Sequence, residues 1–229
     1  MANMNKDQAP PTLSDAQIAP AGLPMLDEGD VATVSGTISV GVAWDASTRG
    51  KSGFVGKLFR KVGADLDASV VLFQDQEPVT LCVGFTPELM NPLHGQPGDG
   101  SVLHSGDNET GDGEGDDETV TLHLDKIPAE FHRIVVQVSA FKEKNKKLGD
   151  KGFQGANNVL FTVYDGAGVG ADKQFCIRPS LVGTENCVIV AVLDRVGNTV
   201  NWNLSKRKVR VNVKHGDLTD LIRKAAAAN

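Results

Sequence analysis

The residues of this chain most able to do chemistry form one acidic, glycine-rich segment. Between Gly106 and Glu118 the sequence is GDNETGDGEGDDE, which holds seven carboxylates with glycines between them. At a spacing of ~6 Å and an effective dielectric of ~20, each pair of like charges costs roughly 2–3 kcal/mol. A folded chain can hold such a segment in one place if a cation offsets the repulsion. The carboxylates, the Asn108 amide and the Thr110 hydroxyl offer oxygen ligands, which suit calcium, an ion that accepts ~6–8 oxygens at ~2.3–2.6 Å.

The flanks of this segment distinguish an ordered loop from a solvated tail. Acidic, glycine-rich runs are often disordered, and a solvated surface is the alternative interpretation here. This segment, however, lies in mid-chain between strand-like apolar residues, Val102 and Leu103 before it and Val120 and Leu122 after it. We therefore expect an ordered calcium loop.

The spacing within the segment excludes an EF-hand. With Asp107 at position 1, Glu118 falls at position 12, as an EF-hand requires. Position 5, however, is Gly111, and position 6 is Asp112 where an EF-hand needs glycine. The flanks are also rich in β-type residues where an EF-hand needs helices.

A second acidic patch precedes an apolar run. The sequence Asp65-Leu66-Asp67-Ala68-Ser69 leads into Val70–Phe73, which is typical of a buried strand. Two aspartates two residues apart on a strand point to the same face. Such pairs more often form turns, but beside a second acidic loop they could be co-ligands of one ion.

Other candidate chemistry is weaker. His104 could donate a hydrogen bond to a carboxylate of the loop, although a core histidine with its own partner is the commoner case. Asp116 and Asp117 could form an acid/base pair, but adjacent carboxylates in a glycine-rich loop favour metal binding. The triplet Gly50-Lys51-Ser52 is not a phosphate loop, because Asp45 stands where that motif needs its first glycine. We identify no nucleophile with a local base.

Composition restricts the class of protein. The formal net charge is −6, and no lysine or arginine lies between Lys61 and Lys126, which argues against nucleic acid as a partner. Three cysteines are too few for a disulfide framework and favour a reducing cytoplasm. The N-terminus lacks the apolar region of a secretory signal, and no apolar run is long enough to span a membrane.

The pattern of apolar residues predicts a mainly β fold, an antiparallel β-sandwich with calcium-binding loops at one end and a few short helices. We expect residues 1–28, which are rich in proline, to be a disordered or loosely attached arm, and residues 29–229 to form a single domain. Helices are expected at Lys142–Leu148 and, with Asp217 as N-cap, at Leu218–Ala228. Trp44 and Trp202 are expected core anchors. The expected strands are Val31–Trp44, Val70–Phe73, Thr80–Phe85, Thr119–Leu124, Arg133–Ala140, Val159–Tyr164, Gln174–Ile177, Cys187–Leu193, Val200–Leu204 and Lys208–Val213.

Three stretches together resemble a known family. Trp44-Asp45, the run Asp65–Ser69 and above all the long run Asp99–Glu118 are similar to the TerD-type tellurite-resistance and stress-response proteins. The resemblance extends over about Val31–Val213. It implies a bacterial, calcium-binding β-sandwich with no established catalytic activity. It also implies a set of ligands, to which Asp45 is a further candidate: Asp65, Asp67, Asp107, Asn108, Asp116, Asp117 and Glu118.

These observations give one leading hypothesis and two alternatives. The leading one is a cytoplasmic, non-enzymatic calcium-binding module that holds two ions through bridging carboxylates and acts by binding other proteins of a stress-response complex. The second is a calcium-dependent membrane or scaffold adaptor, in which the basic segment Thr48–Lys61 attracts anionic lipid. The third is a metal-assisted hydrolase.

Overall fold

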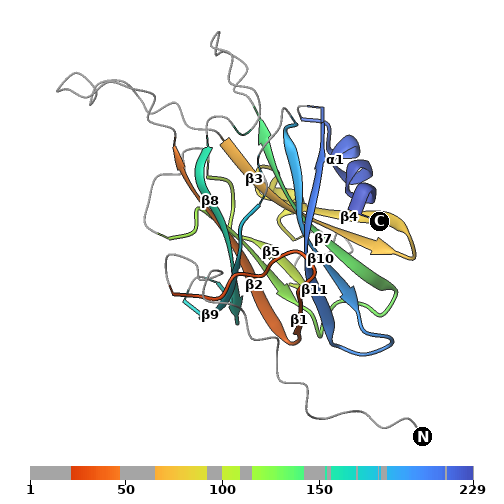
Figure 1. The fold of residues 1–229 in the computed structure, drawn as a ribbon. Helices are drawn as coiled ribbons and strands as arrows, with labels where there is room; N and C mark the ends of the chain where they lie inside the picture. The colour runs from red at the N-terminus through yellow and green to blue at the C-terminus, as the bar shows by residue number, and fades with distance from the viewer. Residues whose placement is uncertain are drawn as a thin grey trace, which may run out of the picture.

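In the described part of the chain, eleven strands form two antiparallel sheets that pack face to face, as expected (Figure 1). The computed structural model describes residues 22–46, 65–91, 100–108, 115–141, 153, 156–168, 170–179, 181, 185–214 and 216–228, with the backbone alone for 45–46, 141 and 156–158. The basic segment 48–61 and the helix expected at 142–148 lie outside these residues. Within them, none of the helices has the length and apolar character needed to cross a membrane.

The first sheet has six strands in the order β1-β11-β10-β7-β3-β4, and every neighbouring pair is antiparallel. Its strands are β1 (Val31–Val34), β3 (Asp65–Gln74), β4 (Glu77–Val83), β7 (Phe131–Phe141), β10 (Cys187–Arg195) and β11 (Trp202–Val211).

The second sheet has five strands in the order β5-β6-β2-β8-β9, again antiparallel throughout. Its strands are β2 (Thr37–Ala46), β5 (Val102–His104), β6 (Glu118–His123), β8 (Ala156–Asp165) and β9 (Asp172–Ile177).

One expected strand is two strands in different sheets. The alternation over Val31–Trp44 predicts a single strand, but β1 lies in the six-stranded sheet and β2 in the five-stranded one. The chain crosses between them at Gly36, whose φ of 67° is unfavourable for other residues. Conversely, the two strands expected at Val200–Leu204 and Lys208–Val213 are the single strand β11, whose register with β10 shifts between Ile189 and Ala191.

The main core lies between the sheets, and a second core lies on the outer face of the six-stranded sheet. Alternate residues of β3 enter each: Leu66 and Leu72 join the main core, and Val71 and Phe73 join the outer one. Both faces of β3 are therefore buried, which explains its continuous apolar run. Trp44 and Trp202 are both buried in the main core, as expected.

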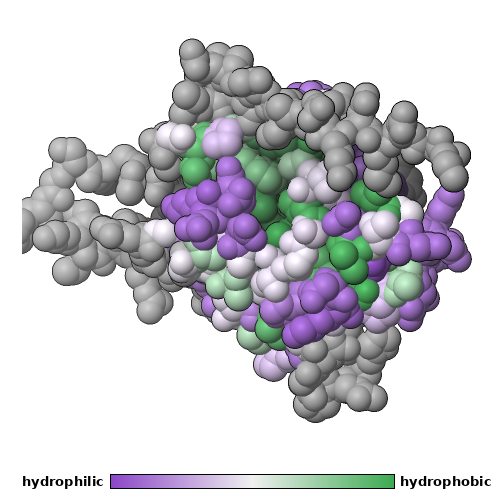
Figure 2. All heavy atoms as spheres, turned by 90° about the horizontal axis from the view of Figure 1, so that it is seen from below, coloured by the Kyte–Doolittle hydropathy of each residue, from purple (hydrophilic) through white to green (hydrophobic). Residues whose placement is uncertain are grey.

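Helix α1 (Leu218–Ala225) covers the outer core and continues as a short 3-10 turn (Ala226–Ala228) (Figure 1). Asp217 caps it by accepting a hydrogen bond from the backbone N–H of Asp220, as the sequence predicts. A further 3-10 turn, Pro87–Leu89, follows β4. Seen from below, the molecule shows hydrophobic residues between groups of hydrophilic ones (Figure 2).

The described part of the expected N-terminal arm, residues 22–28, lies against the sheets. The backbone of Leu26 and Pro24 bonds to that of Cys176 on β9. Further along, Asp27 pairs with Lys206 of β11 at 3.0 Å. This segment therefore connects the edge of the five-stranded sheet to the six-stranded sheet.

Candidate metal centre

Two aspartates at the start of β3 lie where the strand extends beyond its neighbour. β3 pairs with β7 from Asp65 onward, but β4 pairs with it only from Ser69. Leu66 and Ala68 enter the main core, so alternation places Asp65 and Asp67 on the opposite face of β3. The acidic run leading into β3 is therefore part of the strand rather than a turn before it.

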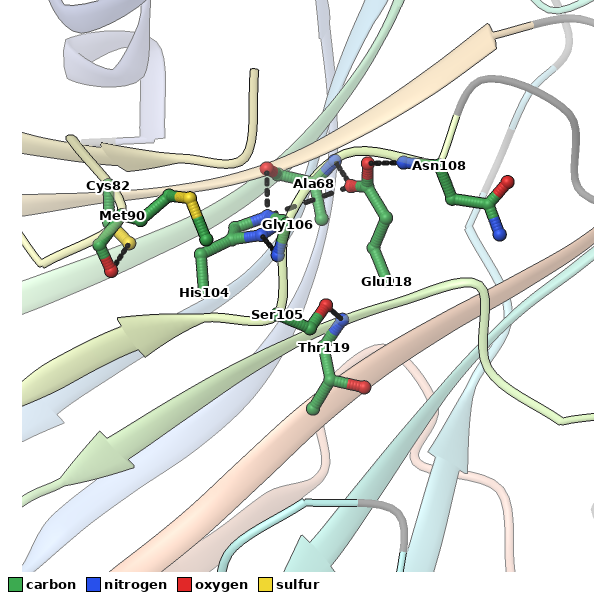
Figure 3. A network of polar contacts seen from close by, with 9 residues as sticks. All are labelled: Ala68, Cys82, Met90, His104, Ser105, Gly106, Asn108, Glu118 and Thr119. Carbon is green, nitrogen blue, oxygen red and sulfur yellow. Dashed lines mark hydrogen bonds and ion pairs between the residues drawn. The ribbon is translucent and has the colours of Figure 1, made fainter. Parts of the chain in front are cut away.

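Side chains from the other sheet bond the backbone of β3 where β4 is absent (Figure 3). The N–H of Ala68 donates to Glu118 Oε2 at 2.8 Å, and the C=O of Ala68 lies 3.1 Å from His104 Nε2. Glu118 Oε1 accepts a second hydrogen bond, at 3.1 Å, from the N–H of Asn108. Glu118 and His104 thus bond the backbone groups of Ala68 in place of β4, and they join the two sheets at this end.

The bonds around His104 determine its tautomer. Its Nδ1 accepts a hydrogen bond from the N–H of Gly106 at 3.1 Å, so Nε2 carries the proton and donates it to the C=O of Ala68. Burial lowers the pKa of His104, although its two backbone partners oppose the shift. A neutral imidazole fits these contacts. His104 Nε2 also lies 3.6 Å from Glu118 Oε2, but its proton bonds to Ala68, so His104 is a buried histidine with a backbone partner of its own.

Three aspartates from two distant segments meet beside this network. One carboxylate oxygen each from Asp65, Asp67 and Asp107 lies within 4.8 Å of the other two. Asp67 is 4% exposed, Asp65 is half-buried and Asp107 is exposed, so the group reaches from the interior to solvent. This group could hold a metal ion.

The surroundings of Asp67 fit a cation. Its Oδ2 is buried and accepts no hydrogen bond from the described residues, and a carboxylate in that state is costly unless something pairs with it. Burial raises the pKa of Asp67 to about 8, with further contributions from the negative charges of Asp65 and Asp107. A divalent ion would supply the missing partner for Oδ2 and offset the repulsion, and the oxygen donor set suits a hard cation such as calcium.

Glu118 belongs to the same electrostatic group. It is 1% exposed, and burial raises its pKa to about 9. The hydrogen bond from Ala68 opposes this shift, whereas the charges of Asp67 and Asp107 add to it. Because two backbone N–H groups already bond both of its oxygens, Glu118 supports the loop and β3 as well as adding negative charge.

Asn108 and Asp117 bond to each other and hold the two ends of the acidic loop together. The side-chain amide of Asn108 donates to Asp117 Oδ1 at 3.2 Å. Asp117 Oδ2 accepts from the N–H of Trp44 at 2.9 Å, and the N–H of Asp117 donates to the C=O of Val42. These bonds fix the loop to the end of β2. The side chain of Asp45 and residues 109–114 of the loop lie outside the described part of the chain.

Asp116 does not belong to the group of three aspartates. Its Oδ2 accepts a hydrogen bond of 2.5 Å from the hydroxyl of Tyr164 on β8. The carboxylate lies against Gly41 of β2, where an added Cβ would come within 1.8 Å of the same oxygen. No pattern in the sequence connects Asp116 with these two residues, beyond the fact that Tyr164 is the single tyrosine of the chain.

The fold and this site define a β-sandwich protein with a carboxylate group at one end of its sheets that could hold a metal. A family model described as the TerD domain matches residues 29–223, and the chain belongs to the TerD family, which confirms the resemblance seen in the sequence.

Two relatives agree with this assignment. The chain is similar to tellurium resistance protein TerZ of Serratia marcescens, with 28% identity over 72% of this chain and 75% of the relative. It is 30% identical to stress response protein SCP2 of Bacillus subtilis (strain 168) over 70% of this chain and 77% of the relative. The names of these two relatives refer to resistance or stress response and to no reaction.

Among solved structures, the fold resembles a homologue of telluride resistance protein TerD from Streptomyces coelicolor A3(2). The TM-score is 0.56 at 18% identity, and the match covers 80% of this chain and 94% of the other. At this identity the likeness shows the fold alone.

Proposed function

We propose that this protein is a non-enzymatic calcium-binding module of the tellurium-resistance and stress-response type. The observation that carries the proposal is the group formed by Asp65, Asp67 and Asp107, in which the buried Oδ2 of Asp67 has no hydrogen-bond partner in the described part of the chain. Calcium is the ion of choice because it accepts many oxygens at ~2.3–2.6 Å in irregular geometry, whereas magnesium demands a near-ideal octahedron.

The ion would act mainly on the arrangement of the elements. Asp65 and Asp67 belong to β3 of one sheet, and Asp107 follows β5 of the other. An ion bound to all three would therefore hold the two sheets and the acidic loop in one arrangement. That ordered end of the sandwich is the surface we propose for a partner protein in the stress response.

More than one ion fits the charge at this end. Glu118 interacts electrostatically with Asp67 and Asp107, so at least four carboxylates share the site. One divalent ion offsets half of their formal charge. A second ion, shared through bridging carboxylates, would offset the remainder.

Calorimetric titration of the metal-stripped protein tests this function. We expect about two calcium ions to bind per chain in preference to magnesium. Asp67→Asn should weaken calcium binding at least about tenfold, because it removes the most buried charge of the three aspartates. Asp125→Asn is the matched control, since Asp125 is an exposed residue in the turn after the opposite end of β6. Equal calcium affinity in the wild type and Asp67→Asn, or no calcium binding, would refute the proposal.

A further inference from the structure

Asp116 differs from the other acidic residues of the loop in what holds its carboxylate. Tyr164 is 2% exposed, and its hydroxyl donates to Asp116 Oδ2 at 2.5 Å. Lys173 of β9 lies with its Nζ 6.0 Å from the centre of the Tyr164 ring. Burial raises the pKa of Asp116, while the hydrogen bond from Tyr164 and the positive charge of Lys173 oppose that shift. Asp116 therefore has a buried donor and a nearby cation of its own.

The backbone around Asp116 is arranged for this contact. Gly41 pairs with Thr119 of β6 on one side and with Thr162 of β8 on the other. Because Gly41 has no side chain, the carboxylate of Asp116 fills the space above it. Gly115, with φ of 102°, turns the chain just before Asp116, a conformation that favours glycine. Two glycines far apart in the sequence thus serve the same contact.

The contact closes the C-terminal end of the acidic loop. At the N-terminal end, Asn108 is held by its backbone bond to Glu118 and its side-chain bond to Asp117. At the C-terminal end, the bond between Asp116 and Tyr164 fixes the loop to β8. A loop whose two ends are already held loses less conformational entropy when an ion orders it, which strengthens binding without adding a ligand.

We propose that Asp116 and Tyr164 form a latch that positions the calcium loop, so that Asp116 acts through Tyr164 rather than by coordinating the ion. This inference rests on the proposed calcium function. It assigns Asp116 a different role from the ligand role that the sequence suggested, and it makes Tyr164 a positioning residue of the site.

The latch and a ligand role predict opposite results for two conservative substitutions. Asp116→Asn keeps an oxygen that accepts the bond from Tyr164, so calcium affinity should stay within about twofold of the wild type. Tyr164→Phe and Asp116→Ala each remove this hydrogen bond. Each should lower the affinity for calcium about three- to tenfold, chiefly through faster dissociation of the ion. The double variant Asp116→Ala/Tyr164→Phe should bind calcium no more weakly than Asp116→Ala alone, because the two substitutions remove the same hydrogen bond.

The measurements are calcium titration by calorimetry and calcium dissociation by stopped flow, with Thr121→Val as control. Thr121 lies on β6, and its hydroxyl bonds to Ser39 at 3.0 Å, so this variant removes a sheet hydroxyl without touching Asp116. The proposal is overturned if Asp116→Asn lowers calcium affinity as much as Asp116→Ala does, while Tyr164→Phe binds calcium as tightly as the wild type. That result would make Asp116 a ligand.

Hydrogen exchange in EDTA tests the latch independently of the ion. Tyr164→Phe and Asp116→Ala should speed exchange of amides over residues 105–119 at least about threefold, whereas Asp116→Asn should leave it near the wild-type rate. Unchanged exchange in Tyr164→Phe and Asp116→Ala would refute the latch. If the wild type binds no calcium, the proposed function fails, and this exchange experiment still decides whether the latch exists.

Discussion

Asp67 and Glu118 are buried carboxyl groups whose surroundings affect how the metal-free protein responds to pH. Their pKa values rise from 3.8 to about 8 and from 4.5 to about 9, because burial disfavours the ionised forms. In the unfolded chain both groups ionise near their ordinary values. Between these limits the folded state binds more protons than the unfolded state.

The resulting prediction concerns stability without metal. The free energy of unfolding in EDTA should fall as the pH rises from about 4.5 to 8, with a slope of up to about 1.4 kcal/mol per pH unit for each group. The contribution is complete below the unfolded pKa values and is lost as the pH passes through the folded ones. Urea unfolding at pH 5 and pH 8 measures it, and Asp67→Asn should flatten the slope. These shifts would be contradicted if the stability of the wild type in EDTA fell no more between pH 5 and pH 8 than that of Asp67→Asn.

Calcium should act in the opposite direction, because it binds the deprotonated carboxylates. The gain in stability caused by calcium should therefore grow across the same pH window. The wild type should show this growth more strongly than Asp67→Asn.

At the residue scale, part of the site was predictable. Asp65 and Asp67 lie two residues apart ahead of an apolar run, and strand alternation alone places them on one face. Their meeting with Asp107 depended on the pairing of the sheets, for which the family resemblance was the guide. The position of Asp116 was not predictable, because its partner Tyr164 lies 48 residues away and only the register of β2 and β8 brings them together.

At the element scale, the overhang of β3 is the feature that makes the site. Because β4 begins to pair only at Ser69, the backbone of Ala68 is open to Glu118 and His104 from the other sheet. The N-cap Asp217 marked the start of the C-terminal helix, and hydrophobic alternation predicted most strands. It could not show that the chain changes sheets at Gly36, because alternation continues on both sides of that residue.

Helix α1 gives a test of the outer core. Leu221 is 1% exposed and packs among residues such as Phe73 and Leu81 beneath the helix. Leu221→Ala should lower the free energy of unfolding by about 2–5 kcal/mol, since it leaves a cavity in an apolar cluster. Thr219→Ala, at an exposed position of the same helix, is the matched control for urea unfolding. A loss no larger in Leu221→Ala than in Thr219→Ala would show that the helix is not packed as described.

At the scale of the whole molecule, the two sheets are joined along both sides by different means. On one side residues 24–27 bond to β9 and β11, and on the other Glu118 and His104 bond to β3. The second connection lies beside the group of aspartates. An ion there would strengthen the join between the sheets, so calcium binding and the rigidity of this end of the sandwich should rise together.

The most direct test of the calcium site is a crystal structure of the calcium-loaded protein with anomalous scattering data. We expect an anomalous peak at ~2.3–2.6 Å from carboxylate oxygens of Asp65, Asp67 and Asp107. The account would be contradicted if crystals saturated with calcium showed no anomalous peak at these three residues, or showed peaks only elsewhere on the chain.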